Sequence, residues 1–334
     1  MAYCAQVLNR ALHELFSENP DVYLIGEDIL DPYGGAFKIS TGLSTRFPAR
    51  VLTTPLSEAA ITGLAAGMAL RGLRPIVEIM FGDFITLAFD QIVNYAAKFH
   101  AMYNGKVNCP LVIRTPMGGR RGYGPTHSQS LEKFLVGVPG ISVVAPSSLH
   151  AVGDLLKRAV LENDAPLLFV ENKSLYSQEN ILPQNGHVGD FDALVSEDVY
   201  PTICLSLNRF EQSDLTLITY GGMAPLALQA ATELAMEKEI FIEIIVPSRI
   251  SPFEITDSIR SLRRTRRLIV AEEGTKSGGW GAEVIAHLTE AADFSFRCAR
   301  VAAKDTVIPC SKELEKAVLP QVRDIIHAAV RLSA

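Results

Sequence analysis

Three side chains are candidates for proton chemistry and cofactor recognition. Glu58 is the single carboxylate of a run of small and apolar residues, TTPLSEAAITGLAAGMALRG (53–72), and lies in the first turn of the helix expected there. Phe84 is an aromatic residue of an apolar segment, and His127 follows a glycine-dense loop at 118–124. A shielded carboxyl group or an imidazole can hold and pass a proton near neutral pH, and an aromatic ring can stack on a heterocycle. These residue types are therefore consistent with a catalytic site.

Each of these residues also has a structural explanation. A carboxylate in the first helical turn interacts with the helix dipole, worth about 0.3–1 kcal/mol, so Glu58 alone does not require a function. Phe84 could be an ordinary core aromatic, and His127 could be a surface loop histidine. The glycines of 118–124 permit close backbone approach, which an active-site loop needs but a sharp turn also needs. Position alone leaves both explanations open.

The elements that must position these residues alternate between short apolar strands and helices. Such alternation predicts mostly parallel sheets with helices on both faces, with ligands bound at the carboxyl ends of the strands. Glu27, Glu58 and the loops after Glu78 and Arg114 all fall at such ends. The expected strands of the first half are 22–25, 75–79, 110–114, 143–145 and 167–170, with helices after Ser57, around 84–99 and at 152–161.

The alternation of apolar strands and helices stops at 177–213 and then resumes. Strands are expected at 215–219, 241–246 and 268–271, with helices near 224–237, 253–262, 281–288 and 322–332. The fold class predicted is α/β, with two doubly wound, mostly parallel-sheet domains. We expect a first domain at 1–180, a linker that leads into the second domain at 181–212, and the second domain at 213–334.

Composition excludes several classes of protein. The net charge is −6, and the one basic cluster, Arg260–Arg267, runs into an apolar strand, which favours a solvated helix end over a nucleic-acid surface. Five cysteines without a CxxC pair favour a reducing compartment over disulfides or structural zinc. No apolar run reaches membrane-spanning length. We expect a soluble, cytoplasmic protein that binds neither nucleic acid nor membrane. A complete GxGxxG fingerprint is also missing, which disfavours a nicotinamide oxidoreductase.

Ordered motifs resemble one family closely. GEDI, GGAFKISTGL, TPLSEAAITGLAAGMALRGLRP, EIMFGDF, DQIVNYAAK, PLVIRTPMGG and HSQSLE are similar, in order and spacing, to the beta subunit of thiamine-diphosphate-dependent 2-oxo acid dehydrogenases. The similarity is dense over 3–176 and resumes with DLTLITYGG, SPFE and AEEGTKSGGWGAEV. It implies a transketolase-like, pyrimidine-binding first domain and a transketolase C-terminal-like second domain. EIMFGDF and AAKFHAMYNG favour acetoin-type and branched-chain members over pyruvate members.

The resemblance implies a role for each site residue. Glu58 would contact a nitrogen of the cofactor's aminopyrimidine ring and relay the proton that activates thiamine diphosphate. Phe84 would stack on that ring, and Leu56 would line the same pocket. His127 would act at the substrate end, with Gln129 supporting its loop. A carboxyl group in such a role benefits from desolvation, which would explain an acid at the mouth of a buried helix.

The family also implies metal ions. A monovalent cation such as potassium would bind backbone carbonyls near Leu111, Val160 and Asn163. Magnesium would bind the cofactor's diphosphate through a GDG stretch and an asparagine-rich segment, and no GDG occurs in this chain. The resemblance therefore implies a separate alpha subunit that holds magnesium and diphosphate, with the cofactor between the chains of an α2β2 heterotetramer.

The sequence leaves open which substrate the protein acts on and which molecule accepts the acyl group. The family decarboxylates a 2-oxo acid, or cleaves acetoin, and passes the acyl group to a lipoyl acyltransferase core. Residues 190–213 depart from the family pattern, so a two-chain thiamine-diphosphate synthase or decarboxylase without a lipoyl partner is an alternative. A non-catalytic assembly subunit is a third hypothesis, which Glu58, Phe84 and His127 disfavour. Arg120 and Arg121 could reach an anionic substrate or face water.

Overall fold

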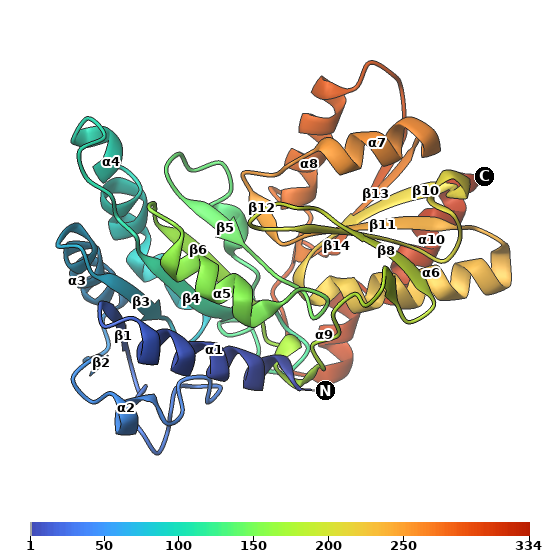
Figure 1. Ribbon diagram of the computed structural model, residues 1–334. Coiled ribbons are helices and arrows are strands. Elements are labelled where there is room, and N and C mark those ends of the chain that lie inside the picture. Colours follow the sequence, from blue (N-terminus) through green and yellow to red (C-terminus); the bar gives the residue numbers. More distant parts are fainter. Residues whose placement is uncertain (1) are drawn as a thin grey trace.

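Two seven-stranded sheets, each covered by helices on both faces, make up the computed structural model, which describes residues 2–334 (Figure 1). The first sheet has the order β12-β5-β6-β4-β3-β1-β2, and every neighbouring pair is parallel except β12–β5. Its strands are β1 (Val22–Gly26), β2 (Val51–Thr53), β3 (Arg74–Glu78), β4 (Val112–Met117), β5 (Ser142–Val144), β6 (Leu167–Asn172) and β12 (Arg249–Ser251).

The second sheet has the order β14-β13-β10-β11-β9-β8-β7. Its strands are β7 (His187–Val188), β8 (Phe191–Val195), β9 (Thr202–Ser206), β10 (Leu215–Thr219), β11 (Ile242–Pro247), β13 (Arg267–Thr275) and β14 (Arg297–Ala303). The strands β14, β13, β10 and β11 are parallel, and β9, β8 and β7 continue the sheet in antiparallel pairs.

Helices cover each sheet in pairs or groups. On the first sheet, α1 (Cys4–Glu18) and α5 (Val152–Leu161) lie on one face, and α3 (Glu58–Leu70), η1 (Gly82–Ala88) and η2 (Gln91–Ala96) on the other. On the second, α6 (Ala224–Lys238) and α10 (Val322–Ser333) oppose α7 (Thr256–Thr265) and α8 (Trp280–Ala291). The short elements are α2 (Leu43–Arg46), α4 (Phe99–Met102), η3 (Glu132–Phe134), η4 (Leu175–Ser177), η5 (Phe210–Gln212), η6 (Gly221–Met223) and α9 (Lys312–Val318).

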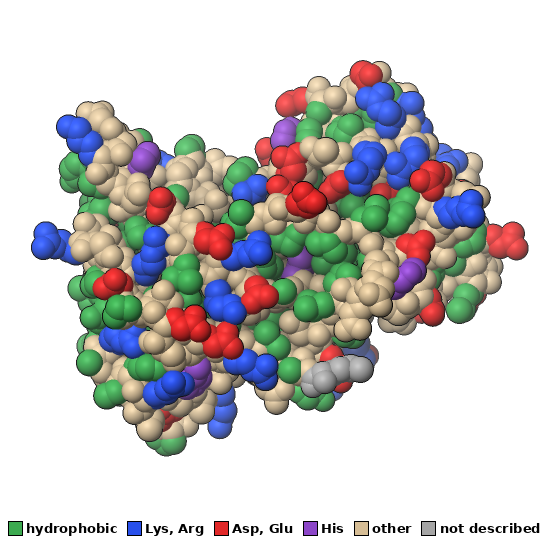
Figure 2. Space-filling view, in the orientation of Figure 1, with side chains coloured by type: hydrophobic (Ala, Val, Ile, Leu, Met, Phe, Trp, Pro, Cys, Tyr) green, Lys and Arg blue, Asp and Glu red, His purple; other side chains and the backbone are tan. Residues whose placement is uncertain are grey.

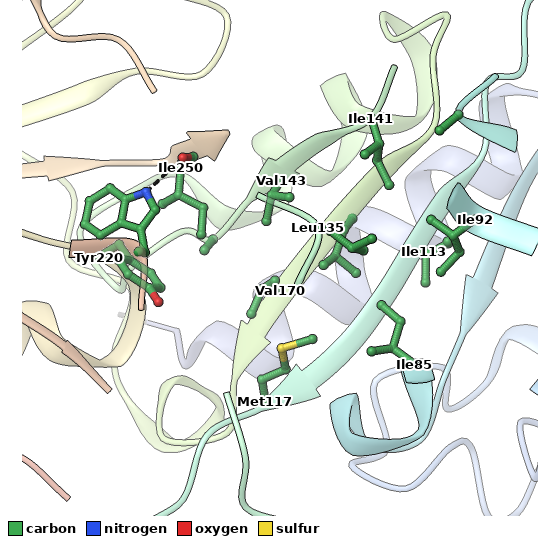
Figure 3. Close-up of a cluster of buried hydrophobic side chains, with 14 of the residues drawn as sticks. Ile85, Ile92, Ile113, Met117, Leu135, Ile141, Val143, Val170, Tyr220 and Ile250 are labelled. Atoms are coloured by element: carbon green, nitrogen blue, oxygen red, sulfur yellow. Dashed lines mark hydrogen bonds between the residues drawn. The ribbon is translucent and has the colours of Figure 1, made fainter. Parts of the chain in front are cut away.

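One apolar core joins the two domains. It runs from the α3 face of the first sheet to Tyr220 and Trp280 of the second, through Ile113, Leu135 and Ile250 (Figure 3). The Trp280 indole, 1% exposed, donates a hydrogen bond to the carbonyl of Ile250 at 2.9 Å, so its polar edge is satisfied inside the core. Since Ile250 belongs to β12, which pairs with β5, the chain of the second domain completes the edge of the first sheet.

Two expectations need correction. The segment 181–212, expected to be a linker, contains β7, β8 and β9, which are strands of the second sheet. The expected helix 84–99 is divided into a 3₁₀ helix (η1), a π helix (η2) and the first turn of α4. An apolar period near 3.6 does not separate these hydrogen-bond patterns, because 3₁₀ and π helices differ from an α-helix by less than about one residue per turn, and segments this short do not resolve that difference.

Charges of both signs are spread over the visible surface. On the face in Figure 2, lysine and arginine side chains are interspersed with aspartate and glutamate, and basic side chains gather over α7. The cluster Arg260–Arg267 is the end of α7 and the start of β13, as expected. Among residues 2–334 no helix is both long and apolar enough to cross a membrane.

Candidate active site

The carboxyl ends of β1, β2, β3 and β4 meet at one edge of the first sheet. Glu27 follows β1, Glu58 begins the helix after β2, Phe84 lies on η1 after β3, and the glycine loop 118–124 follows β4. Adjacent parallel strands bring their following loops together, which is why residues from distant segments form one candidate site.

Glu58 lies in a buried acidic pair. It is the first residue of α3 and 8% exposed, and Glu27 is 4% exposed. The main-chain amide of Ser57 donates a hydrogen bond to Glu27 Oε1 at 3.1 Å, so Glu27 holds the residue that precedes α3. Burial raises the pKa of Glu27, and the nearby charge of Glu58 raises it further. Two carboxyl groups shielded from water thus lie close to the start of α3.

Aromatic rings surround His127. Its imidazole lies edge-on to Phe81, with ring centres 4.6 Å apart, and to Phe84, at 5.3 Å. Phe81 also contacts Phe84, Tyr123 and Phe37. The hydroxyl of Thr126 lies 2.9 Å from His127 Nδ1. The predicted residues Phe84 and His127 are thus brought together, and η1, which carries Phe84, packs against α3.

Gln129 is held by a buried aspartate next to Phe84. Its side-chain amide donates to Asp83 Oδ1 at 2.8 Å, and its main-chain amide donates to the same oxygen at 3.3 Å. Asp83 is 6% exposed. This contact joins the His127 segment to η1. Leu56, by contrast, is 76% exposed in the loop before α3, so the described residues 2–334 leave most of it uncovered.

The second domain fixes the glycine loop. The amide of Gly119 donates to Glu273 Oε1 at 2.6 Å, and the Arg120 guanidinium forms an ion pair with Glu273 at 3.0 Å. Glu315, on α9, accepts the amides of Arg120 and Gly122 at 2.9 and 3.0 Å. Gly118 has a φ of +90°, and a Cβ there would lie 2.6 Å from Glu273, so glycine permits the approach.

Arg120 and Arg121 are therefore bound within the chain. Besides Glu273, Arg120 donates to the carbonyl of Pro320 at 2.7 Å. Arg121 donates to the carbonyl of Lys173 at 2.8 Å and lies over the Phe37 ring. Arg120 is thus engaged in holding the loop, whereas Arg121 is exposed and its other N–H donors are free for water or a substrate.

A buried ionic network lies beneath this edge of the sheet. Arg114 donates to Glu78 at 2.5 Å and to both oxygens of Glu171 at 2.8 and 2.6 Å, and the Tyr176 hydroxyl donates to Glu171 at 2.7 Å. Arg114 is 2% exposed. Burial raises the pKa of Glu78, while Arg114 opposes that shift. The network fixes the ends of β3, β4 and β6, from which the site loops begin.

Lys173 is fully buried behind Phe81. Its ammonium nitrogen lies 5.5 Å from the Phe81 ring centre, and no hydrogen-bond partner for it exists among residues 2–334. Burial lowers the pKa of Lys173 to about 8, against the opposing charges of Asp83 and Glu273. The Lys173 ammonium group is thus a buried positive charge beside Phe81, one of the aromatic rings that contact His127.

The carbonyls expected to bind a monovalent cation lie at the opposite edge of the sheet. Leu111 precedes β4, and its carbonyl accepts the amide of Leu167 at 2.8 Å. The carbonyls of Val160 and Asn163, at the end of α5, accept hydrogen bonds from Arg74 at 2.7 and 3.2 Å. Each of the three oxygens thus accepts a hydrogen bond from a protein donor.

Family comparisons define the class of protein. Residues 2–178 match the model "Transketolase, pyrimidine binding domain", and residues 207–325 match "Transketolase, C-terminal domain". The solved structure described as "Split gene transketolase, inactive beta4 tetramer" has the same fold, with a TM-score of 0.74 at 21% identity, over 98% of both chains. This chain belongs to the transketolase-like family.

Full-length relatives define the branch. The chain is 38% identical to "Pyruvate dehydrogenase E1 component subunit beta-1, mitochondrial" of Arabidopsis thaliana, over 97% of this chain and 87% of the relative. It is 36% identical to "Pyruvate dehydrogenase E1 component subunit beta" of Leifsonia xyli subsp. xyli, over 98% and 93%. Within the family it belongs with the beta subunits of thiamine-diphosphate-dependent 2-oxo acid dehydrogenases.

An acetoin-type relative is similar to nearly the same degree. The "Acetoin:2,6-dichlorophenolindophenol oxidoreductase subunit beta" of Cupriavidus necator is 34% identical, over 96% of this chain and 94% of the relative. These values do not favour acetoin-type over pyruvate-type members, unlike the preference drawn from EIMFGDF and AAKFHAMYNG.

Sequence reasoning missed the residues that support the site. Asp83, Lys173, Glu273 and Glu315 received no role, although all four lie next to the histidine segment or its loop. The partners are separated by 46 residues for Asp83 and Gln129, and by 195 for Arg120 and Glu315. A signal was present for Glu273 and for Asp83, since AEEGTKSGGWGAEV and EIMFGDF were among the matching motifs, and Lys173 lies within the densely similar residues 3–176.

Proposed function

We propose that this chain supplies the pyrimidine half of a two-chain thiamine-diphosphate active site, in which a 2-oxo acid is decarboxylated or acetoin is cleaved. The observation that carries the proposal is the buried Glu58 at the start of α3, paired with Glu27 and adjacent to the helix that bears Phe84. The described residues fit this half of the cofactor: a shielded carboxyl group suits a ring nitrogen, and Phe84 suits stacking on the ring.

The side chains have separate tasks in this proposal. When bound, thiamine diphosphate supplies the electron sink that lets a 2-oxo acid lose carbon dioxide. Glu58 donates a hydrogen bond to the ring nitrogen, and Leu56 and Phe84 hold the ring. His127 hydrogen-bonds or transfers a proton at the substrate end, beside the rings of Phe81 and Phe84. Gln129 and Asp83 keep the histidine segment against η1.

The other half of the site would come from an alpha subunit. Among residues 2–334 no group of three or more histidine, cysteine, aspartate or glutamate side chains could hold a metal ion. We therefore assign magnesium and the diphosphate to the alpha subunit, in an α2β2 assembly.

An exposed apolar surface supports such a partner. Leu64, on α3, is 53% exposed, and no heavy atom lies within 4 Å of a Cβ built at Gly67, one turn further along. Further exposed apolar side chains come from the neighbouring segments, namely Leu56, Leu87, Tyr95 and Met102. One face of α3 packs on its own sheet, while the other is free for a second chain.

The test is reconstitution. The chain is purified alone and with its alpha subunit, and carbon dioxide release from pyruvate and cleavage of acetoin are measured with thiamine diphosphate and magnesium. Activity is expected only with both chains, and substantial turnover by the lone chain would contradict the two-chain site. Leu64→Glu should block copurification with the alpha subunit. Met236→Glu, which alters a residue of α6 that is 80% exposed, should not.

The same preparation separates the two other candidates. An active pair that does not acylate a lipoyl domain would be a synthase or decarboxylase without a lipoyl partner, which the departures in 190–213 motivate. An assembled pair with no turnover on any 2-oxo acid or acetoin would indicate a non-catalytic subunit.

A further inference from the structure

The C-terminal end of α5 is held by an arginine from a neighbouring strand. Arg74 is the first residue of β3, and its Nη1 atom donates to the carbonyls of Val160 at 2.7 Å and Asn163 at 3.2 Å. Its Nη2 atom lies 3.7 Å from the Asp164 carboxylate. The guanidinium therefore joins two main-chain oxygens and one acidic side chain within a single turn.

This turn has a physical need for positive charge. The last carbonyls of an α-helix lack intrahelical donors, and the helix dipole makes that end partly negative. Val160 lies in the last turn of α5, and it is 1% exposed, so water has little access to its carbonyl. A bound cation or a charged donor can satisfy these oxygens, and Arg74 does so with hydrogen bonds.

The remaining oxygen expected to bind a cation, and one further carbonyl of this turn, also accept hydrogen bonds. The carbonyl of Leu111 accepts the amide of Leu167 at 2.8 Å, within the start of the sheet. The carbonyl of Ala165 accepts the Asn163 side-chain amide at 2.7 Å. A monovalent cation bound to the Val160 oxygen would lie beside the guanidinium, and two like charges sharing one ligand repel each other. The residues present do not fit a cation site.

We propose that the guanidinium of Arg74 takes the place of the monovalent cation at the end of α5. The strand β3 connects this end of the sheet with Glu78 and the loop of Phe84 at the other, so the contact keeps α5 and β3 in register at the base of the candidate site. The chain is then independent of potassium for its fold.

Thermal unfolding of the full chain tests this without measuring activity. The melting temperature is recorded at equal ionic strength in potassium chloride and in tetramethylammonium chloride. The wild-type chain should melt at the same temperature in both salts. Arg74→Met, which keeps an apolar stem but removes every donor, should melt about 3–6 °C lower in tetramethylammonium chloride. Potassium chloride should restore part of that loss, because the freed oxygens then accept the ion.

Arg71→Met is the matched control. Arg71 lies three residues earlier, is exposed, and its side chain makes no hydrogen bond to any residue of 2–334, so this variant should behave as the wild type in both salts. A wild-type melting temperature that rises specifically with potassium would overturn the proposal. The proposal also fails if Arg74→Met melts like Arg71→Met, or if potassium restores nothing to Arg74→Met.

Discussion

The carboxylate of Glu273 accepts a hydrogen bond from the main-chain amide of Gly119 at 2.6 Å, and thereby joins β13 of the second sheet to the loop that leads to His127. Glu315 makes two further hydrogen bonds to the same loop, through the amides of Arg120 and Gly122. The second domain thus shapes a site whose proposed chemical groups all belong to the first. This explains why the glycine loop needs no regular structure of its own.

Limited proteolysis can test this arrangement. Trypsin cleaves after arginine, and the loop contains Arg120 and Arg121. In Glu315→Ala two amides lose their acceptor, at about 1–3 kcal/mol for each buried donor left unpaired, and the loop should open more often. We expect faster cleavage after Arg120 or Arg121, detected by mass spectrometry. Glu313→Ala, which alters an exposed residue on the same helix, should cleave as slowly as the wild type. Equal rates for both variants would mean that Glu315 does not hold the loop.

Arg114 should be essential for stability. In Arg114→Leu the carboxylates of Glu78 and Glu171 lose their buried counterion, which should reduce the free energy of unfolding by about 3–5 kcal/mol at neutral pH. Protonation removes the uncompensated charge, so the deficit should shrink as the pH falls. Denaturant unfolding at several pH values measures both the loss of unfolding free energy and its dependence on pH. The surface variant Arg10→Leu is the control. A deficit below about 1 kcal/mol would show that water or neighbouring groups solvate the carboxylates.

His150 should make stability depend on pH. Burial lowers the pKa of His150 to about 4 from an ordinary value of 6.5, so the imidazole is protonated at a lower pH in the folded chain than in the unfolded chain. The contribution of neutral His150 to the free energy of unfolding is present above pH 6.5 and is lost as the pH falls towards 4. It amounts to at most about 3 kcal/mol. His150→Gln should flatten the decline of unfolding free energy between pH 6.5 and 4. His327→Gln, on the exposed side of α10, should leave the decline unchanged. An identical slope in wild type and His150→Gln would contradict the buried neutral histidine.

The sequence predicts the repeating parts of this fold well. The helix at 152–161 and the strand at 215–219 have the bounds that periodicity indicates, because one apolar face fixes each of them. The short strands β7 to β9 lie among prolines, glycines and acids, and their pairing depends on β11, which is distant in the sequence. Periodicity therefore missed them, and it could not reveal that β12 crosses to the first sheet.

The candidate site is predictable to a similar extent. The carboxyl ends of parallel strands bring Glu58 and the His127 segment to one edge, and the observed edge agrees with that expectation. The structure does not test the roles of Glu58, Leu56, Phe84, His127 and Gln129, which stay predictions. What could not be predicted depends on side-chain geometry between distant segments, such as Asp83 with Gln129 and Arg74 with Val160.

The most direct test of the central claim is the turnover of Glu58→Gln, assembled with the alpha subunit and supplied with thiamine diphosphate and magnesium. Glutamine keeps the size of the side chain and removes the transferable proton, so the rate should fall by about 10²–10⁴-fold. Copurification with the alpha subunit and the melting temperature should stay unchanged, as they should in the exposed control Glu18→Gln. A Glu58→Gln enzyme that turns over within a few-fold of the wild type would contradict the assignment of Glu58 as the activating acid.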